Sequence, residues 1–307
     1  MSNRTIKDWI IATRPWSFPA SVMPVIVAIA YTFYIYGVSD TVNWGFGLLA
    51  IVGIILIHAG GNLISDFHDY NKGIDNKETV CVQTIVSGLF KPSEVFWYGL
   101  ILLLIGSFIG LYLVVSHFGV KLLLIGLFGI GSAIGYYLFK FRALGDLLIF
   151  LAFGPMAMLG SGVVLTGDLD PMYMILSIPI GFITVGILHA NNTLDIESDT
   201  KAGIKTFASI LGIKWSVYYY KGLLGLAALI IIGLALVGKI PLYAIVSVLL
   251  VAPLMMNCQK TMGQAQQNIS ALVGLDESTA KLQMAFSVAL SLALIIEPII
   301  GLIKTLI

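Results

Sequence analysis

Two short acidic windows stand out in an otherwise apolar sequence. Seven of the sixteen acidic residues fall in them: Asp66, Asp69, Asp75 and Glu78 in the first window, and Asp195, Glu197 and Asp199 in the second. Carboxylates are costly beside a bilayer, so acidic clusters at the ends of apolar segments indicate a site for polyvalent cations or other positive groups. The sequence therefore predicts metal-dependent chemistry at a membrane surface.

The two windows share one construction. Asn62 precedes Asp66 by four residues and Asn191 precedes Asp195 by four, so each pair lies on one helical face. Carboxylates three or four residues apart repel one another unless a cation sits among them, and hard oxygen ligands suit Mg²⁺. The predicted metal ligands are Asn62, Asp66, Asp69, Asp75, Asn191, Asp195 and Asp199. A single such window could equally be solvated loop charge or helix caps, but two matched windows favour a site.

The composition places this site in a membrane protein. Hydrophobic residues make up 58% of the chain and charged residues 11%, against about 25% charged in soluble domains. Stretches long enough to span hydrocarbon predict nine transmembrane helices. They run over about 16–37, 44–66, 94–116, 119–139, 145–166, 171–193, 214–237, 241–258 and 281–303. The net charge of +1 gives no indication of nucleic-acid binding.

Basic residues give the predicted orientation. Fourteen of the seventeen Lys and Arg residues fall on one side of the nine-span arrangement, and the other side receives only Lys121, Lys239 and Lys304. By the positive-inside rule, the N-terminus is expected in the cytoplasm and the C-terminus outside, in a prokaryotic inner membrane. Both acidic windows then open on the cytoplasmic face.

We therefore expect an all-α integral membrane fold built as one domain over residues 1–307. Its nine helices would form a bundle with a central cavity that opens near the cytoplasmic face and is capped by polar loops. The spacing of the two windows suggests an internal four-helix repeat, about 16–140 and 145–260, followed by a ninth helix. Other residues inside the spans predict helix packing, namely His58 and His189 through hydrogen bonds and the pairs Gly106–Gly110 and Gly131–Gly135 through close approach.

The motifs resemble those of the UbiA superfamily of intramembrane prenyltransferases. The run from His58 to Asp75 is similar to the first aspartate motif of that superfamily, and the run from Asn191 to Thr206 resembles the second. Within the superfamily, the chain is most similar to the 1,4-dihydroxy-2-naphthoate polyprenyltransferases of menaquinone synthesis. Further agreement comes from Arg14-Pro15, Leu144 to Pro155, and Thr279 to Gln283.

The chain departs from the naphthoate branch in two places. Ser65-Asp66 stands where that branch usually has Asn-Asp, and the amide occurs one turn earlier, at Asn62. The basic residue that relatives carry before the Ser87-Gly88 pair is replaced by Gln83-Thr84. The first difference affects how the first motif coordinates a metal. The second affects phosphate contact from the loop that contains Gln83 and Thr84.

The resemblance implies transfer of a polyprenyl group from its diphosphate to an aromatic acceptor, with two Mg²⁺ ions bridging the diphosphate. In the naphthoate branch the acceptor loses carbon dioxide to give a demethylmenaquinol. The implied catalytic residues are Asp66, Asp69, Asp195, Asp199 and Tyr136, the last as an aromatic face for the allylic cation. The implied substrate-binding residues are Arg14, Asn62, Lys140, Arg142, Asn191, Asn192, Lys201 and Lys205. Arg14 could face an acceptor carboxylate or simply anchor the first span. Positive-inside topology is an alternative explanation for Lys140, Arg142, Lys201 and Lys205, and interfacial anchoring is one for Tyr136.

Two alternatives stay open. A sibling of the superfamily could prenylate 4-hydroxybenzoate, haem, chlorophyllide or a glycerol phosphate, because pocket shape decides the acceptor. A cation-coupled transporter would also use carboxylates near helix ends, but it needs them near mid-membrane. Only Glu297 lies well inside a predicted span.

Overall fold

The computed structural model describes residues 4–73, 84–140, 142–201 and 203–306. Over these residues the chain is almost entirely helical, without a β-strand, and nine helical segments are long and apolar enough to cross a membrane. The predicted all-α, multi-pass membrane fold is confirmed. Asp75 and Glu78 of the first acidic window lie outside the described residues.

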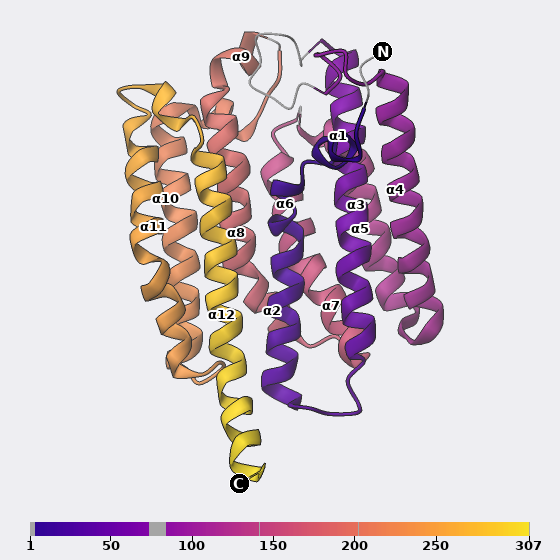
Figure 1. Ribbon diagram of the computed structural model, residues 1–307. Coiled ribbons are helices and arrows are strands. Elements are labelled where there is room, and N and C mark those ends of the chain that lie inside the picture. The colour runs from indigo at the N-terminus through magenta and orange to yellow at the C-terminus, as the bar shows by residue number, and fades with distance from the viewer. Residues whose placement is uncertain (1–3, 74–83, 141, 202, 307) are drawn as a thin grey trace.

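Figure 1 shows the helices in their order along the chain. The first part of the chain forms α1 (Ile6–Ala12), η1 (Pro15–Ser17), α2 (Pro19–Tyr36), α3 (Trp44–Asn71), α4 (Pro92–Leu113), η2 (Val114–Phe118), α5 (Gly119–Lys140), α6 (Gly145–Leu151), η3 (Ala152–Met156) and α7 (Ala157–Thr166). The second part forms α8 (Pro171–Leu194), α9 (Ile196–Lys201), α10 (Phe207–Leu236), η4 (Leu242–Ala244), α11 (Ile245–Gln264), η5 (Ile269–Leu272) and α12 (Leu275–Leu306).

Helices α2, α8, α10, α11 and α12 form the densely packed half of the bundle. Their facing side chains make one large buried cluster that includes Tyr173 and Tyr220. Two polar contacts join helices across this core, where an unsatisfied polar group is costly. The Tyr220 hydroxyl lies 2.5 Å from Thr279 Oγ1, and Gln283 Nε2 donates to Thr184 Oγ1 at 2.9 Å.

The fifth span is interrupted at its centre. Helices α6 and α7 are joined through η3, a π-helical turn that contains Pro155. Proline has no N–H to donate and crowds the preceding turn, and a wider turn relieves both conflicts.

Helices α3 and α4 approach each other closely through glycine. A Cβ atom on Gly60 would lie 2.7 Å from the Gly99 carbonyl oxygen, and one on Gly106 would lie 3.1 Å from the Gly53 oxygen. The packing role predicted for Gly106 is confirmed. It is wrong for Gly110 and Gly131, where a Cβ would meet nothing within 4 Å.

Helix α3 continues farther than the sequence suggests. The predicted span stops at residue 66, whereas the helix ends at Asn71 and is followed by Gly73 in a left-handed conformation, with φ 70°. Gly73 tolerates that conformation, and no proline interrupts the segment before it. Asp66 and Asp69 are therefore on the last turns of a helix and not in a loop.

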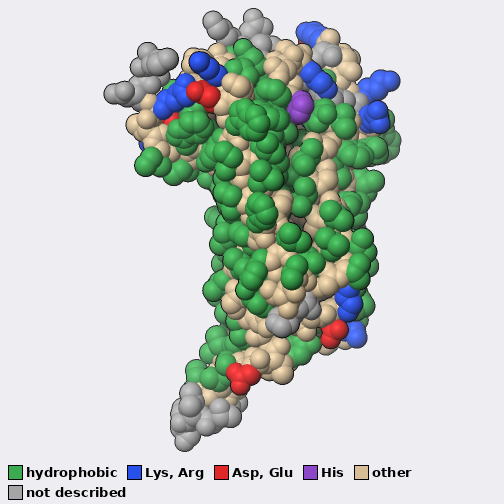
Figure 2. Space-filling model, turned by 90° about the vertical axis from the view of Figure 1, so that its right-hand side faces the viewer, with side chains coloured by type: hydrophobic (Ala, Val, Ile, Leu, Met, Phe, Trp, Pro, Cys, Tyr) green, Lys and Arg blue, Asp and Glu red, His purple; other side chains and the backbone are tan. Residues whose placement is uncertain are grey.

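The outer surface agrees with a membrane setting. Hydrophobic side chains cover the middle of the face shown in Figure 2, and charged side chains gather toward its two ends. The two termini lie at opposite ends of the bundle, as an odd number of crossings requires (Figure 1). The ends of α3 and α5, together with α9, lie at the N-terminal end.

Replacing Gly60 should destabilise this fold, because any larger side chain overlaps the backbone of α4. We expect Gly60→Leu to lower the free energy of unfolding by about 1–3 kcal/mol, the usual effect of overpacking. Thermal unfolding in detergent, followed by size-exclusion chromatography, measures the change.

The matched control is Gly131→Leu, which adds the same side chain where nothing lies within 4 Å. Equal unfolding temperatures for the two variants would contradict the close approach of α3 and α4.

Candidate active site

The first acidic motif is buried at the end of α3. Asp66 and Asp69 are only 2% and 6% exposed, and their spacing of three residues places them on the same side of the helix. Ionised carboxylates in such a setting require compensating charge. The structure supplies it from two other elements.

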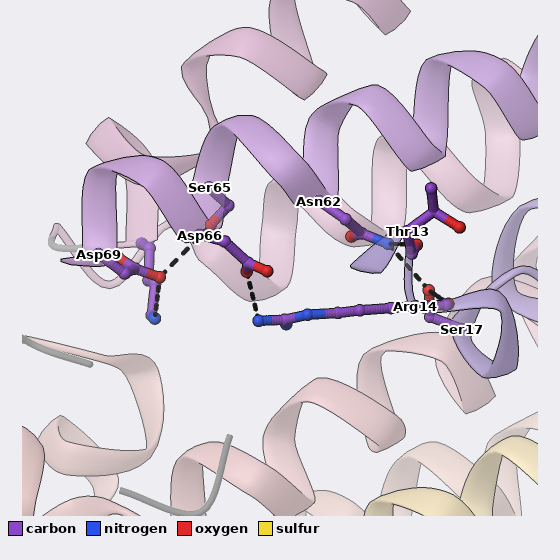
Figure 3. Close-up of polar contacts among 8 residues, drawn as sticks. Thr13, Arg14, Ser17, Asn62, Ser65, Asp66 and Asp69 are labelled. Atoms are coloured by element: carbon purple, nitrogen blue, oxygen red, sulfur yellow. Dashed lines mark hydrogen bonds and ion pairs between the residues drawn. The ribbon is translucent and has the colours of Figure 1, made fainter. Parts of the chain in front are cut away.

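Arg14 approaches Asp66 from the segment between α1 and η1. Its guanidinium Nη2 forms an ion pair and hydrogen bond with Asp66 Oδ1 (Figure 3). The Arg14 backbone is left-handed, with φ 57° and ψ 58°, which costs a residue other than glycine about 1 kcal/mol or more. A strained residue whose side chain reaches a buried carboxylate is typical of functional sites.

Asn62 fastens the segment that carries Arg14. Its side-chain nitrogen donates to the Thr13 carbonyl oxygen and to Ser17 Oγ, each at 3.1 Å (Figure 3). Ser17 Oγ also donates to the Arg14 carbonyl oxygen at 2.8 Å. The predicted ligand Asn62 is thus engaged with the N-terminal segment, one turn before Asp66. Sequence reasoning missed Thr13 and Ser17, whose role arises only from this contact.

Lys140, the last residue of α5, approaches Asp69. The Lys140 Nζ lies 3.4 Å from Asp69 Oδ2, and Ser65 Oγ lies at the same distance from that oxygen. The other carboxylate oxygen, Asp69 Oδ1, is buried and has no hydrogen-bond partner among the described residues. It is thus available to a ligand or a cation.

The second acidic motif lies where α8 ends and α9 begins. Asp195 is the C-cap of α8, and Asn191 Nδ2 donates to Asp195 Oδ2 at 3.1 Å. Asp199 follows on α9 and is 9% exposed. The shared helical face predicted for Asn191 and Asp195 is confirmed by their contact.

The charges of the two motifs act on each other. Burial raises the pKa of Asp199 to about 6, the Lys140 ammonium opposes this shift, and the carboxylates of Asp195 and Asp69 add to it. Burial likewise raises the pKa of Asp195, against the effect of Lys140. Lys140 therefore lies where it influences the acids of both motifs.

The other predicted basic residues lie around the same end. Lys201 pairs with Glu197 at 2.6 Å on the exposed face of α9. Arg142 and Lys205 are exposed and form an isolated β-bridge, in which Ala143 N donates to the Lys205 carbonyl oxygen at 2.7 Å. This bridge joins the α5–α6 connection to the segment that follows α9. The remaining predicted residue, Asn192, is 5% exposed.

The residues present fit a divalent cation, although they are not gathered around one point. Among the described residues, no group of three His, Cys, Asp or Glu side chains is close enough to hold a metal ion. The acids of the first motif instead form ion pairs with side-chain cations, Asp66 with Arg14 and Asp69 with Lys140. The buried, unpartnered Asp69 Oδ1 and the all-oxygen donor set are the features that a Mg²⁺ ion would use.

An apolar cavity of about 550 Å³ lies beside the first motif. Arg14, Asn62, Ser65 and Tyr136 line one part of it, and the rest of its wall is mostly apolar. His58 also lines the cavity and lies 2.8 Å from Ser21 Oγ through Nδ1, which confirms the predicted contact between helices. A polar patch beside an apolar cavity matches an amphiphilic ligand.

The buried contact between His189 and Asp146 was not predicted as part of the site. His189 Nδ1 lies 2.9 Å from Asp146 Oδ2, and the two residues are 0% and 5% exposed. The contact ties α8 to the start of α6. The detectable signal was Asp146 itself, since a carboxylate at the start of an apolar span needs a partner.

Neutralising Asp199 should stabilise the ligand-free protein at neutral pH and not at acidic pH. Its folded pKa, about 6, lies above the ordinary value of 3.8, so ionisation opposes folding and the penalty grows as pH rises through that interval. We expect Asp199→Asn to gain about 1–2 kcal/mol at alkaline pH and nearly nothing at pH ~4. Unfolding temperatures across a pH series measure this.

The control is Glu197→Gln, because Glu197 is exposed and paired with Lys201. A pH-independent effect of Asp199→Asn, or the same gain in the Glu197 variant, would show that Asp199 is not desolvated.

Comparison with known proteins identifies similar sequences and folds. A sequence model of the UbiA prenyltransferase family matches residues 21–274. The rat protein called UbiA prenyltransferase domain-containing protein 1 is 33% identical over 297 residues, which are 95% of this chain and 84% of that protein. The human protein of the same name is 35% identical over 231 residues, or 73% of this chain, and the match spans 66% of the human protein's length.

Two solved structures share the fold. The apo structure of a UbiA homolog from Aeropyrum pernix K1 superposes with a TM-score of 0.67 at 16% identity, covering 91% of this chain and 97% of that one. A UbiA homolog from Archaeoglobus fulgidus bound to DMAPP and Mg²⁺ gives 0.61 at 15% identity, covering 92% and 98%. At these identities the likeness establishes the shared architecture.

Proposed function

Because this chain belongs to the UbiA prenyltransferase family, and is thus a prenyltransferase, we propose that it transfers a polyprenyl group from its diphosphate to an aromatic acceptor with Mg²⁺. One observation carries the proposal. Two buried carboxylate motifs, on α3 and at the α8–α9 junction, interact with the same lysine, and the first adjoins an apolar cavity. An ionic head with an isoprenoid tail requires such a combination.

The proposed metal ligands come from the two acidic motifs. We assign Mg²⁺ to Asp66, Asp69, Asp195 and Asp199, with Asn62, Asn191 and Asp75 as further candidates from the sequence. The archaeal homolog bound to DMAPP and Mg²⁺ supports this choice of ion. When bound, Mg²⁺ would neutralise the diphosphate and stabilise the charge that develops as it departs.

The chain's own residues would act around the head group. Arg14 and Lys140 are already directed at the acidic site and would bind diphosphate oxygens once a metal takes over the carboxylates. Arg142, Lys201, Lys205 and Asn192 lie around the same end and are proposed as further contacts. Tyr136 lines the cavity, where its ring can stabilise positive charge on the allylic carbon.

The reaction then needs little further chemistry from the protein. The allylic carbon–oxygen bond breaks, its electron pair leaves with the diphosphate, and a ring carbon of the electron-rich acceptor bonds to the allylic carbon. An apolar cavity keeps water from capturing the cation first.

The cation-transporter alternative is not favoured. No described acidic residue lines the cavity, and Glu297 lies exposed on α12 beside Tyr243.

For the acceptor we propose 1,4-dihydroxy-2-naphthoate, with loss of its carboxylate as carbon dioxide. The support is the sequence resemblance over Leu144 to Pro155 and the basic residue Arg14 in the cavity wall. Acceptors of the sibling enzymes are the alternatives.

The proposed orientation puts the acidic end in the cytoplasm, because most Lys and Arg residues lie on that side. The animal relatives lend no support to a prokaryotic inner membrane.

An assay with purified protein tests the reaction. With Mg²⁺, a polyprenyl diphosphate and labelled dihydroxynaphthoate, we expect pyrophosphate, carbon dioxide and a lipid-soluble quinol. Asp66→Asn should lower kcat/KM by ~100-fold or more, because it removes a preorganised charge at the leaving group. Glu197→Gln, at an exposed acid of the second motif, should retain most activity.

Two outcomes would count against the proposal. If no donor length gives product with naphthoate but one does with 4-hydroxybenzoate, the acceptor is wrong and the prenyl transfer stands. If a monodisperse Asp66→Asn protein keeps near-normal turnover, Asp66 does not hold the metal.

A further inference from the structure

Helix α1 packs one of its faces against α3 and α4. Ala12 is buried in a small cluster with Leu63 of α3 and Val95 of α4. Trp9 packs against the same cluster, and the ring centroids of Trp9 and Tyr98 are 5.0 Å apart, edge to face. Because Trp9 and Ala12 are three residues apart, they occupy one side of the helix, and that side is committed to the bundle.

The opposite face of α1 is apolar and exposed. Ile6 and Ile10, one helical turn apart, are 81% and 52% exposed, and Trp16 in the following η1 turn is 50% exposed. Lys7 lies beside the two isoleucines and is also exposed. An apolar stripe bordered by a lysine and followed by a tryptophan is typical of a helix that lies in a membrane interface.

The depth of α1 brings this stripe level with the apolar outer surface. Its C-terminal end meets Asn62, which donates to the Thr13 carbonyl oxygen about 13 Å before the end of α3 at Asn71. On α4, Trp97 and Ile101 are 60% and 51% exposed beside the cluster that receives α1. Figure 1 shows α1 below the upper ends of α4 and α9. The exposed stripe therefore continues the lipid-facing surface of the bundle.

The stability of α1 matters for the acidic site. The helix has seven residues, and isolated helices of that length are marginal in water, so its contacts must hold it. Arg14 follows two residues after the helix ends, with its strained left-handed backbone, and pairs with Asp66. Any loosening of α1 would release one side of the segment that directs this guanidinium.

We propose that α1 is an interfacial helix whose outer face, Ile6 and Ile10, inserts into the lipid interface, and that this insertion holds Arg14 at Asp66. The partner is the boundary between lipid head groups and acyl chains, with Lys7 reaching the phosphates. The bilayer would thus act as a positioning element for an active-site cation. The effect on activity rests on the proposed function, whereas the insertion itself does not.

Spin labels test the insertion in liposomes of phosphatidylcholine and phosphatidylglycerol. Single cysteines are introduced as Ile6→Cys and Ile10→Cys in a full-length chain whose own Cys81 and Cys258 are replaced by alanine. Glu197→Cys on the exposed face of α9 is the aqueous reference, and Leu229→Cys, at a 63% exposed position of α10, is the lipid reference.

We expect both α1 labels to resemble the lipid reference, accessible to oxygen and protected from a water-soluble nickel chelate. Labels as accessible to the chelate as the aqueous reference would overturn the insertion. Labels shielded from both reagents would also overturn it, because the face would then be covered by protein, either another segment of the chain or a second copy.

Kinetics in the same liposomes test the link to Arg14. Combining Ile6→Gln with Ile10→Gln should lower kcat/KM ~10-fold or more, since a misplaced charge is costly to catalysis. Gln favours helix at least as well as Ile, so helix propensity cannot cause the loss. The matched control is Ile210→Gln, at a 63% exposed position near the start of α10, which should keep most activity.

If insertion acts through Arg14, the two Gln substitutions should add little to the loss caused by Arg14→Gln. Additive losses, or an equal loss in Ile210→Gln, would contradict the link. A readout without turnover is the mobility of a spin label at Trp16→Cys, which the two Gln substitutions should increase. An unchanged mobility would show that insertion does not hold this segment.

Failure of the proposed function would look different. It would appear as no turnover of any polyprenyl diphosphate by the unmodified chain, while the accessibility and mobility of the labels would still decide whether α1 is inserted.

Discussion

The site depends on the compensation of buried carboxylates by cations from other helices. Asp66 and Asp69 lie almost fully buried at the end of α3, where an isolated negative charge would be strongly disfavoured. Arg14 and Lys140 neutralise them from the N-terminal segment and from α5. Since each cation belongs to a different element, the charge pairs also determine how these elements meet.

This constraint explains otherwise unfavourable local features. The left-handed backbone at Arg14 persists because Asn62 and Ser17 hold the adjoining peptide groups while the guanidinium is bound to Asp66. Asp199 is held partly desolvated, with a raised pKa, opposite Lys140. Each feature costs stability in the free protein.

The two halves of the bundle differ in packing. Helices α2, α8, α10, α11 and α12 pack into a continuous core that contains the Tyr220–Thr279 hydroxyl pair. Helices α3 to α7 line the cavity, and Gly110, Gly126 and Gly129 leave room beside α4 and α5. The packed half anchors the second acidic motif through α8 and the His189–Asp146 pair. The open half carries the first motif and the cavity.

The sequence by itself determined the membrane class, the nine spans and both acidic motifs, because hydrophobic length and the cost of charge are local properties of a segment. It also identified Arg14 and Lys140 as candidates, but without their partners. Only the tertiary structure paired Arg14 with Asp66 and Lys140 with Asp69, and engaged Asn62 with Thr13 and Ser17. The same spacing of four residues that predicted packing for Gly110 lines a cavity instead. Such outcomes depend on which helix stands opposite, and that is decided by the packing of segments distant in the chain.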